Sequence, residues 1–313
     1  MEVDQVSEVA AKEQQIVSNA RQSTYGAELK FDSDRLKIFY ERIFPYKMFF
    51  KWLSYNLLKT RNEQTLASID DKEVLSDYFY NREFSFTLAN DVYCRYLCFK
   101  TAEDFKQALT SRVPHKIDIG AVFNFAPSRH LTCSDKKAFV PLEKEMVFDI
   151  DMDAYDDVRS CCSGANVCQK CWLYLNVAAK LLTDMLRDDF DFDNCLWVFS
   201  GRRGVHCWIC DPEARNMSNE MRTAVTQYCN IGSGNENSGK VSLSYPLHPN
   251  LRKAFDFLLP FFEEIVVTEQ NLLSEQTHQD RFINYMPYDA RDNLKNKWLK
   301  CKGDGSEMWR VWQ

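Results

Sequence analysis

Hydrophobic and polar side chains alternate with a period of two between residues 146 and 153. A strand over this stretch therefore has one apolar and one anionic face. The apolar face carries Phe148, Ile150 and Met152. The anionic face carries Asp149, Asp151 and Asp153. Aspartate is unfavourable in strands, so three at alternate positions indicate a site. A half-exposed strand whose carboxylates only contact water is the alternative.

Upstream, the pattern predicts two amphipathic helices separated by a proline. Apolar side chains recur at helical spacing after Asp34, and Asp32, Ser33 or Asp34 is available as the cap. Pro45 ends this helix and suits the first turn of a second one over residues 46–58. The second helix is expected to point four side chains inward, namely Met48, Phe49, Trp52 and Leu53.

Residues 82–88 and 92–99 also alternate, and the short polar turn between them predicts a β-hairpin. Glu83 and Arg95 then lie on a shared sheet. Two interpretations of this pair stay open: a cross-strand ion pair and a contact to substrate.

Two later stretches have strand character. Residues 116–123 alternate, with Lys116 and Asp118 on one face. Residues 196–210 are typical of a strand, a glycine-flanked turn and a second strand.

The turn within 196–210 has the chemistry of a triphosphate clamp. Gly201 and Gly204 permit tight backbone conformations, and Arg202 and Arg203 offer forked donors that suit phosphate oxygens. His206 is placed to reach the same pocket. A solvated pair of arginines and an ordinary hydrogen-bonded histidine remain as alternatives.

The aspartates fit the needs of phosphoryl transfer. Side chains two positions apart on a strand are separated by roughly 6.5–7 Å along the chain. Two carboxylates at this spacing can converge on two divalent cations about 3.5–4 Å apart.

The strongest metal-binding pattern is a set of four cysteines at positions 161–171, ending in Cys-x-x-Cys. Four thiolates so close in sequence can enclose one tetrahedral zinc ion, and such a closed site is structural. Ser163 and Gly164 let the backbone bend between the ligands. Reduced, packed thiols are the alternative. The cysteines are Cys161, Cys162, Cys168 and Cys171.

Composition narrows the class of protein. The 313 residues are 45% hydrophobic, which is enough for one large or two smaller domains. A net charge of −6 argues against a uniformly basic surface for nucleic acid, so any such contact is local. The first residues lack the pattern of a signal peptide, and the cysteine spacing favours a reducing compartment. We expect no membrane segment, because the most apolar run, residues 255–267, is broken by Pro260 and two glutamates.

Together these motifs resemble the catalytic small subunit of eukaryotic DNA primase, over about residues 34–300. The resemblance implies a mixed α/β primase fold, with a mixed sheet core flanked by helices and a zinc-stabilised helical insertion. It rests on the motifs Arg82–Leu88, Lys116–Val122, Val147–Met152, Cys161–Cys171 and Ser200–Trp208.

The resemblance implies a role for each motif residue. Asp149 and Asp151 match the Mg²⁺- or Mn²⁺-binding pair. The nucleotide-binding residues are Ser200, Arg202, Arg203 and His206, with Asp118 at the ribose. Those near the initiating nucleotide or primer end are Glu83, Arg95 and Lys116. The zinc ligands are Cys161, Cys162, Cys168 and Cys171.

The resemblance also implies synthesis of short RNA primers on single-stranded DNA from ribonucleoside triphosphates, for replication in the nucleus. The implied partners are the iron-sulfur large subunit of primase and DNA polymerase alpha.

The chain departs from the family pattern in two ways. A third metal-binding aspartate would lie beyond Gln313, so residues 31–313 are expected to form an incomplete catalytic domain after a mobile tail over 1–30. A longer insert spans residues 59–78. Two other functions therefore stay open: a catalytically inactive, zinc-stabilised fragment that binds nucleotide or a partner, and a primase-polymerase of damage tolerance.

Overall fold

The computed structural model describes residues 32–60, 74–130, 132–231 and 246–313. The chain divides into two compact units, Met1–Val140 and Pro141–Gln313. The predicted tail over 1–30 and most of the insert over 59–78 lie outside the described residues.

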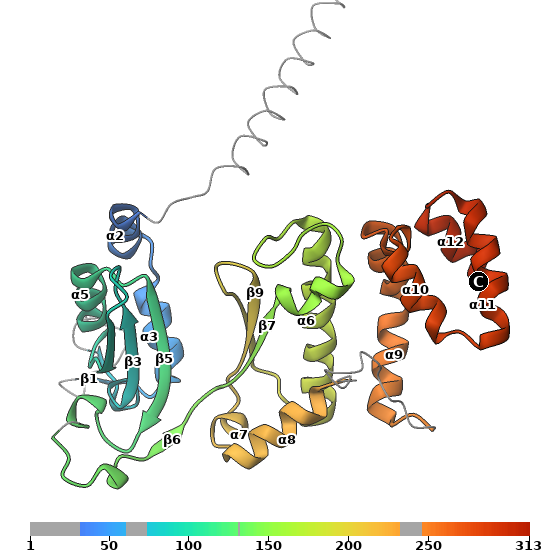
Figure 1. Ribbon diagram of the computed structural model, residues 1–313. Coiled ribbons are helices and arrows are strands. Elements are labelled where there is room, and N and C mark those ends of the chain that lie inside the picture. Colours follow the sequence, from blue (N-terminus) through green and yellow to red (C-terminus); the bar gives the residue numbers. More distant parts are fainter. Residues whose placement is uncertain (1–31, 61–73, 131, 232–245) are drawn as a thin grey trace, which may run out of the picture. The chain divides into compact units, whose positions relative to one another are not determined.

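The first unit is built on an antiparallel sheet covered by helices (Figure 1). Strand β3 (Arg82–Thr87) lies between β4 (Tyr93–Leu97) and β5 (Lys116–Phe123) and is antiparallel to both, which confirms the predicted hairpin. The two-residue strands β1 (Lys59–Thr60) and β2 (Val74–Leu75) pair with each other antiparallel. The helices are α2 (Ser33–Arg42), α3 (Tyr46–Ser54), α4 (Asp77–Tyr80) and α5 (Ala102–Arg112). Two short 3₁₀ turns follow, η3 (Pro127–Arg129) and η4 (Lys136–Ala138).

The core of the first unit is aromatic. Phe84 on β3 and Phe105 on α5 are fully buried, with ring centroids 5.2 Å apart. Asp32 caps α2, as predicted, because its carboxylate accepts from the N–H groups of Asp34 and Arg35.

Two expectations for the second helix are wrong. Met48 is 74% exposed, because it lies on the outer side of α3, whereas Leu53 is fully buried. The helix ends at Ser54, because Tyr55 and Asn56 adopt positive φ angles that a right-handed helix cannot contain.

The second unit carries a three-stranded antiparallel sheet in the order β7-β9-β8. Its strands are β7 (Met146–Asp151), β8 (Cys195–Phe199) and β9 (Gly204–Ile209), so the predicted strand, turn and strand over 196–210 are confirmed. The long helix α6 (Gln169–Phe190) runs beside this sheet (Figure 1), and its Leu182 and Leu186 pack against Cys207 and Ile209.

The rest of the second unit is mainly helical. Before β7 lies the short strand β6 (Pro141–Glu143), and after β7 comes the 3₁₀ segment η5 (Met152–Val158). The later helices are α7 (Pro212–Arg215), α8 (Asn219–Cys229) and α9 (Pro249–Phe261), which continues into the π-helix η6 (Phe262–Glu269). They are followed by η7 (Leu272–Ser274), α10 (Gln276–Tyr285), α11 (Tyr288–Trp298), η8 (Leu299–Cys301) and α12 (Gly305–Trp312). We call residues 262–313 the C-terminal helical layer; it has its own core around Trp298 and Trp309.

The fold is therefore mixed α/β, as predicted. Within the described ranges, no helix is long and apolar enough to cross a membrane.

Candidate functional site

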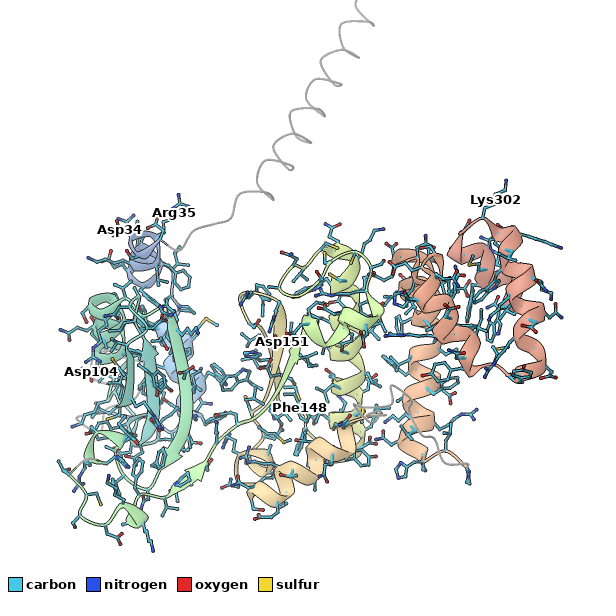
Figure 2. The ribbon with its side chains drawn as sticks, viewed as in Figure 1. Asp34, Arg35, Asp104, Phe148, Asp151 and Lys302 are labelled. Carbon is cyan, nitrogen blue, oxygen red and sulfur yellow. The ribbon has the colours of Figure 1, made fainter. Side chains whose placement is uncertain are left out.

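The acidic strand has the two faces that its sequence predicts, but it is shorter. Pairing with β9 ends at Asp151 opposite Gly204, beyond which the partner strand turns away. Asp153 therefore lies in η5 and not on the strand, which corrects the expected alternation of three aspartates. The apolar side chains Phe148 and Ile150 pack against the core of the unit. Figure 2 labels Phe148 and Asp151 of this strand.

Strand pairing sets the first contact of the acidic face. Asp149 lies directly opposite His206 in the β7-β9 register. The His206 Nε2 atom is 3.3 Å from Asp149 Oδ1. His206 is half-buried, whereas the Asp149 side chain is 65% exposed and accessible to a ligand.

Arg203 forms ion pairs with the other two aspartates, Asp151 and Asp153. Its Nη2 atom lies 3.2 Å from Asp151 Oδ2 and 2.8 Å from Asp153 Oδ2. The backbone carbonyl of Arg203 accepts from Met152 N–H at 3.1 Å, so the turn before β9 is bound to the end of β7. The structure thus brings Asp149, Asp151, Arg203 and His206 together.

The glycines of this turn have distinct physical roles. Gly201 has a φ of +90°, which side chains rarely adopt. At Gly204 a Cβ atom would lie 2.5 Å from Asp151 Oδ1 and 2.7 Å from the Ile150 carbonyl oxygen, so the two strands approach too closely for any side chain. Ser200 closes the turn, because its Oγ accepts from Gly204 N–H at 3.0 Å.

Arg202 projects from the turn and is exposed. Among the residues that the structure describes, its side chain has no ion-pair partner. It is therefore available to an anionic ligand, whereas Arg203 is already paired with Asp151 and Asp153.

Behind the acidic strand, the second unit contains an apolar cavity of about 710 Å³. Phe148 and Ile150 of β7 form part of its wall, together with side chains of α6, α8, α9 and η6. The strand thus separates a charged surface from an apolar interior.

In the first unit, Glu83 and Arg95 form the cross-strand ion pair that was one of the two interpretations. Arg95 Nε donates to Glu83 Oε1 at 3.1 Å, and Tyr96 N–H donates to the same oxygen at 3.3 Å. The hydrogen bond to Glu83 raises the pKa of Arg95. Glu83 is buried, and Tyr96 is held at a φ of +59° beside it.

Lys116 and Asp118 lie on one face of β5, as predicted, and both are exposed. Asp118 lies opposite Ser85 and Lys116 opposite Thr87 in the register with β3. Their contacts with a nucleotide stay a prediction.

The four cysteines of residues 161–171 converge in the second unit. Their sulfur atoms all lie within 4.8 Å of one another, and those of Cys168 and Cys171 are 3.9 Å apart. A tetrahedral zinc ion with Zn–S bonds of about 2.3 Å needs sulfur separations of about 3.8 Å, so this set fits a metal ion. Cys171 is fully buried.

Arg159 shapes the loop that carries these cysteines. Arg159 is 4% exposed, and its guanidinium donates to the carbonyl oxygens of Gly164 at 2.8 Å and Asn166 at 2.9 Å. It also lies 3.8 Å from Cys171 Sγ and pairs with Asp156. Two hydrogen bonds hold the pKa of the Asp156 carboxyl below its usual range. The one from Gly164 N–H has the larger effect, and the one from Arg159 the smaller.

The thiols differ in acidity. Burial, followed by the hydrogen bond with Cys168, raises the pKa of Cys162 to about 12. Burial also raises the pKa of Cys161, against an opposing effect of the Gln270 side chain. For Cys168 burial is outweighed by backbone N–H donors and neighbouring thiols, which lower its pKa to about 7.

Sequence reasoning missed Arg159 and Gln270. Arg159 gave a weak signal, because a basic residue beside a thiolate cluster can offset its charge. Gln270 gave no signal in the sequence, because it lies 109 positions from Cys161. Its side-chain oxygen accepts a hydrogen bond from the Cys161 N–H.

Comparison with known proteins shows which proteins the chain is similar to. Residues 148–297 match the family model of the DNA primase small subunit. The chain is 40% identical over 285 residues to the DNA primase small subunit of Drosophila melanogaster, covering 90% of this chain and 61% of the fly protein. It is 36% identical over 280 residues to that of Saccharomyces cerevisiae, covering 88% of this chain and 64% of the yeast protein.

The DNA primase small subunit of Caenorhabditis elegans is 38% identical over 267 residues, covering 83% of this chain and 60% of the worm protein. These matches confirm the resemblance to the DNA primase small-subunit family that the motifs predicted. The chain spans about three fifths of the length of these relatives.

Proposed function

We propose that this chain carries the catalytic centre of a DNA primase, which makes short RNA primers on single-stranded DNA from ribonucleoside triphosphates. The observation that carries the proposal is the pairing of β7 with β9, which places two accessible carboxylates beside Arg203 and His206. The similarity to DNA primase small subunits supports the same reaction.

Asp149 and Asp151 are the proposed ligands of two Mg²⁺ or Mn²⁺ ions. Both carboxylates are accessible, and oxygen ligands suit these cations. When bound, such ions lower the pKa of an attacking 3′-hydroxyl and stabilise the triphosphate and the pyrophosphate leaving group.

Ser200, Arg202, Arg203 and His206 are the proposed contacts of the incoming triphosphate. Arg203 and His206 balance the aspartates in the structure described here. Arg203 and His206 would donate to phosphate oxygens of a bound triphosphate, where the charge of Arg203 would stabilise the transition state. In the first unit, Asp118 is assigned to the ribose, and Glu83, Arg95 and Lys116 to the initiating nucleotide or primer end.

We assign zinc to the four cysteines. Four thiolates leave no open position for substrate, so the ion would stabilise the fold and take no part in the reaction. We further propose a role in replication in the nucleus, with the iron-sulfur large subunit of primase and DNA polymerase alpha as partners; the similarity to DNA primase small subunits supports this proposal.

A second candidate is a nucleotide- or partner-binding protein without catalysis. It is favoured by the pairing of Arg203 with both Asp151 and Asp153, because a guanidinium in that position competes with a metal ion.

The test is incorporation of labelled ATP on a poly-dT template with Mg²⁺ or Mn²⁺. The unaltered chain is expected to make oligoadenylate, whereas the chain with Asp149→Ala and Asp151→Ala should make none. Asp292→Ala is the matched control, because it removes an exposed carboxylate on α11, far in sequence from the acidic strand.

Synthesis by the double variant at the rate of the unaltered chain would refute the assignment of the aspartates. Metal-dependent ATP binding without any incorporation would favour the second candidate.

A further inference from the structure

We call residues 160–171, which include the four cysteines, the cysteine loop. This loop contacts the C-terminal helical layer at the end of the π-helix η6. Gln270 follows this helix directly, and its N–H donates to the carbonyl oxygen of Ile265 at 2.9 Å, five residues earlier. Short π-helical turns often occur at functional positions. Here the wide turn directs a glutamine that is only 2% exposed towards the cysteine loop.

The carbonyl oxygen of the Gln270 side chain holds the start of the cysteine loop. Its Oε1 accepts from Ser160 N–H at 2.9 Å and from Cys161 N–H at 3.3 Å. The Ser160 hydroxyl donates to the backbone carbonyl of Gln270. The first zinc ligand of the proposed site is therefore positioned by a residue of the C-terminal helical layer.

Among the residues that the structure describes, the nitrogen of the same side chain, Gln270 Nε2, is buried without a well-formed hydrogen bond to an acceptor. Buried donors without acceptors are uncommon in folded proteins, and each one calls for an explanation, such as an ion or a water molecule bound at the site. Oε1 accepts from the Cys161 N–H, and Nε2 is bonded to the same carbon atom as Oε1, so Nε2 lies near the Cys161 peptide.

A metal-bound Cys161 would supply the missing acceptor. Four thiolates around one Zn²⁺ carry a net charge of −2, and outer donors commonly stabilise such ligands. Cys171 already has two donors, the Cys168 N–H at 3.1 Å and Arg159 at 3.8 Å. Gln270 Nε2 would play the corresponding role for Cys161.

We propose that Gln270 is a positioning residue of the metal centre, whose Nε2 donates to the metal-bound sulfur of Cys161 while Oε1 fixes the Cys161 peptide. The inference rests on the proposed zinc site. It also links metal binding to the C-terminal helical layer, because the next residue, Asn271, accepts from Gly305 N–H of α12 at 3.0 Å.

The decisive variant is Gln270→Glu in the full chain. It keeps the size of the side chain and the oxygen that holds the loop, but it replaces the N–H donor with a carboxylate oxygen beside a thiolate. Zinc affinity, measured by competition with a chromophoric chelator, is expected to fall about tenfold or more. With Co²⁺ in place of zinc, the sulfur-to-metal charge-transfer band is expected to shift, because its energy depends on hydrogen bonds to the sulfur.

Gln279→Glu is the matched control. Gln279 lies in the same helical layer and donates through Nε2 to the Leu273 carbonyl oxygen at 2.8 Å, so the same change removes a donor away from the cysteines. Its zinc affinity and Co²⁺ spectrum should equal those of the unaltered chain. If Gln270→Glu does not fold, Gln270→Met, which also lacks the donor, should show the same spectral shift.

The outcomes separate the two proposals. Failure of the unaltered chain to bind zinc would overturn the zinc site and, with it, the role of Gln270. Normal zinc binding with an unchanged affinity and spectrum in Gln270→Glu would overturn the role of Gln270 alone. Removal of zinc should also speed amide hydrogen exchange over residues 262–271 of the unaltered chain; unchanged exchange there would refute the link to the helical layer.

Discussion

Arg202 and Arg203 are neighbours in sequence but have different surroundings. Arg203 is bound by Asp151 and Asp153, whereas Arg202 projects into solvent. Two adjacent residues of one type therefore differ before any ligand binds: Arg203 is paired with carboxylates of the acidic strand and the segment after it, and Arg202 is exposed.

Arg202→Ala tests this difference. Loss of one charge-assisted hydrogen bond to phosphate is expected to raise the Kd of Mg²⁺-ATP about tenfold or more, without a change in stability. Equilibrium titration with a fluorescent ATP analogue measures the effect. Arg252→Ala, which removes an exposed arginine of α9 paired with Asp256 at 3.1 Å, should leave the Kd unchanged. Equal weakening by both substitutions would indicate a general effect of charge.

The acidity of the cysteines predicts how metal binding depends on pH. The thiolate is the ligand, and Cys161 and Cys162, whose pKa values are raised, keep their protons near neutral pH. Each proton that a metal must displace lowers the apparent affinity by up to about tenfold per pH unit below the pKa. Affinity for zinc should therefore rise with pH from 6 to 8. A pH-independent Kd would show that the thiols are not the ligands.

At the residue scale, sequence patterns predict candidate site residues that lie close together in the chain. Alternation predicts that Asp149 and Asp151 share one face, and closeness in sequence predicts that the four cysteines converge; the structure confirms both placements. Gln270 is not found, because its role arises only when the end of a π-helix meets a loop 109 positions earlier. Nothing in its neighbours along the chain distinguishes it from a surface glutamine.

At the element scale, the limits of a strand depend on its partner. Alternation over residues 146–153 predicts a longer strand, but β7 ends where β9 begins its turn. The apolar pattern likewise places Met48 inward, although the neighbours of α3 cover another side. Period and type of element can be read from the sequence, whereas ends and buried faces depend on tertiary contacts.

Gly204→Ala tests the closest approach of β7 and β9. Its Cβ would meet the Ile150 carbonyl oxygen, which cannot move without its strand, so a loss of about 1–3 kcal/mol in stability is expected. Displacement of Asp151 should also abolish most ATP incorporation.

Gly303→Ala is the control for this loss of stability. It introduces strain at a φ of +84°, remote in sequence from the sheet, and should cost about 1–2 kcal/mol without affecting incorporation per folded molecule. Urea unfolding measures stability in both variants. Retention of full activity by Gly204→Ala would refute the need for close strand approach.

At the scale of the whole molecule, the two compact units have separate cores. The aromatic core of the first unit surrounds Phe84 and Phe105, and the cysteines pack around Leu175 in the second. Composition alone could not place the division after Val140, because neither glycine nor proline accumulates there.

Cys168→Ser tests whether the metal stabilises the second unit alone. Zinc content should fall to near zero, and a loss of about 2 kcal/mol should lower the unfolding midpoint of Pro141–Gln313 by about 4–8 °C. Metal analysis and calorimetry measure the two effects. Cys133→Ser, in the first unit, should change neither. A zinc-free Cys168→Ser protein with unaltered stability would refute a structural role for the metal.

The two faces of β7 also determine which changes in chain length the protein can tolerate. Because Phe148 and Ile150 wall an apolar cavity while Asp149 and Asp151 face outward, insertion or deletion of one residue within β7 would exchange the faces. Carboxylates would then enter the interior, and apolar side chains would replace them at the surface. A change of two residues would preserve the alternation. This strand should therefore accept substitutions on its apolar face far more readily than any single-residue change in its length.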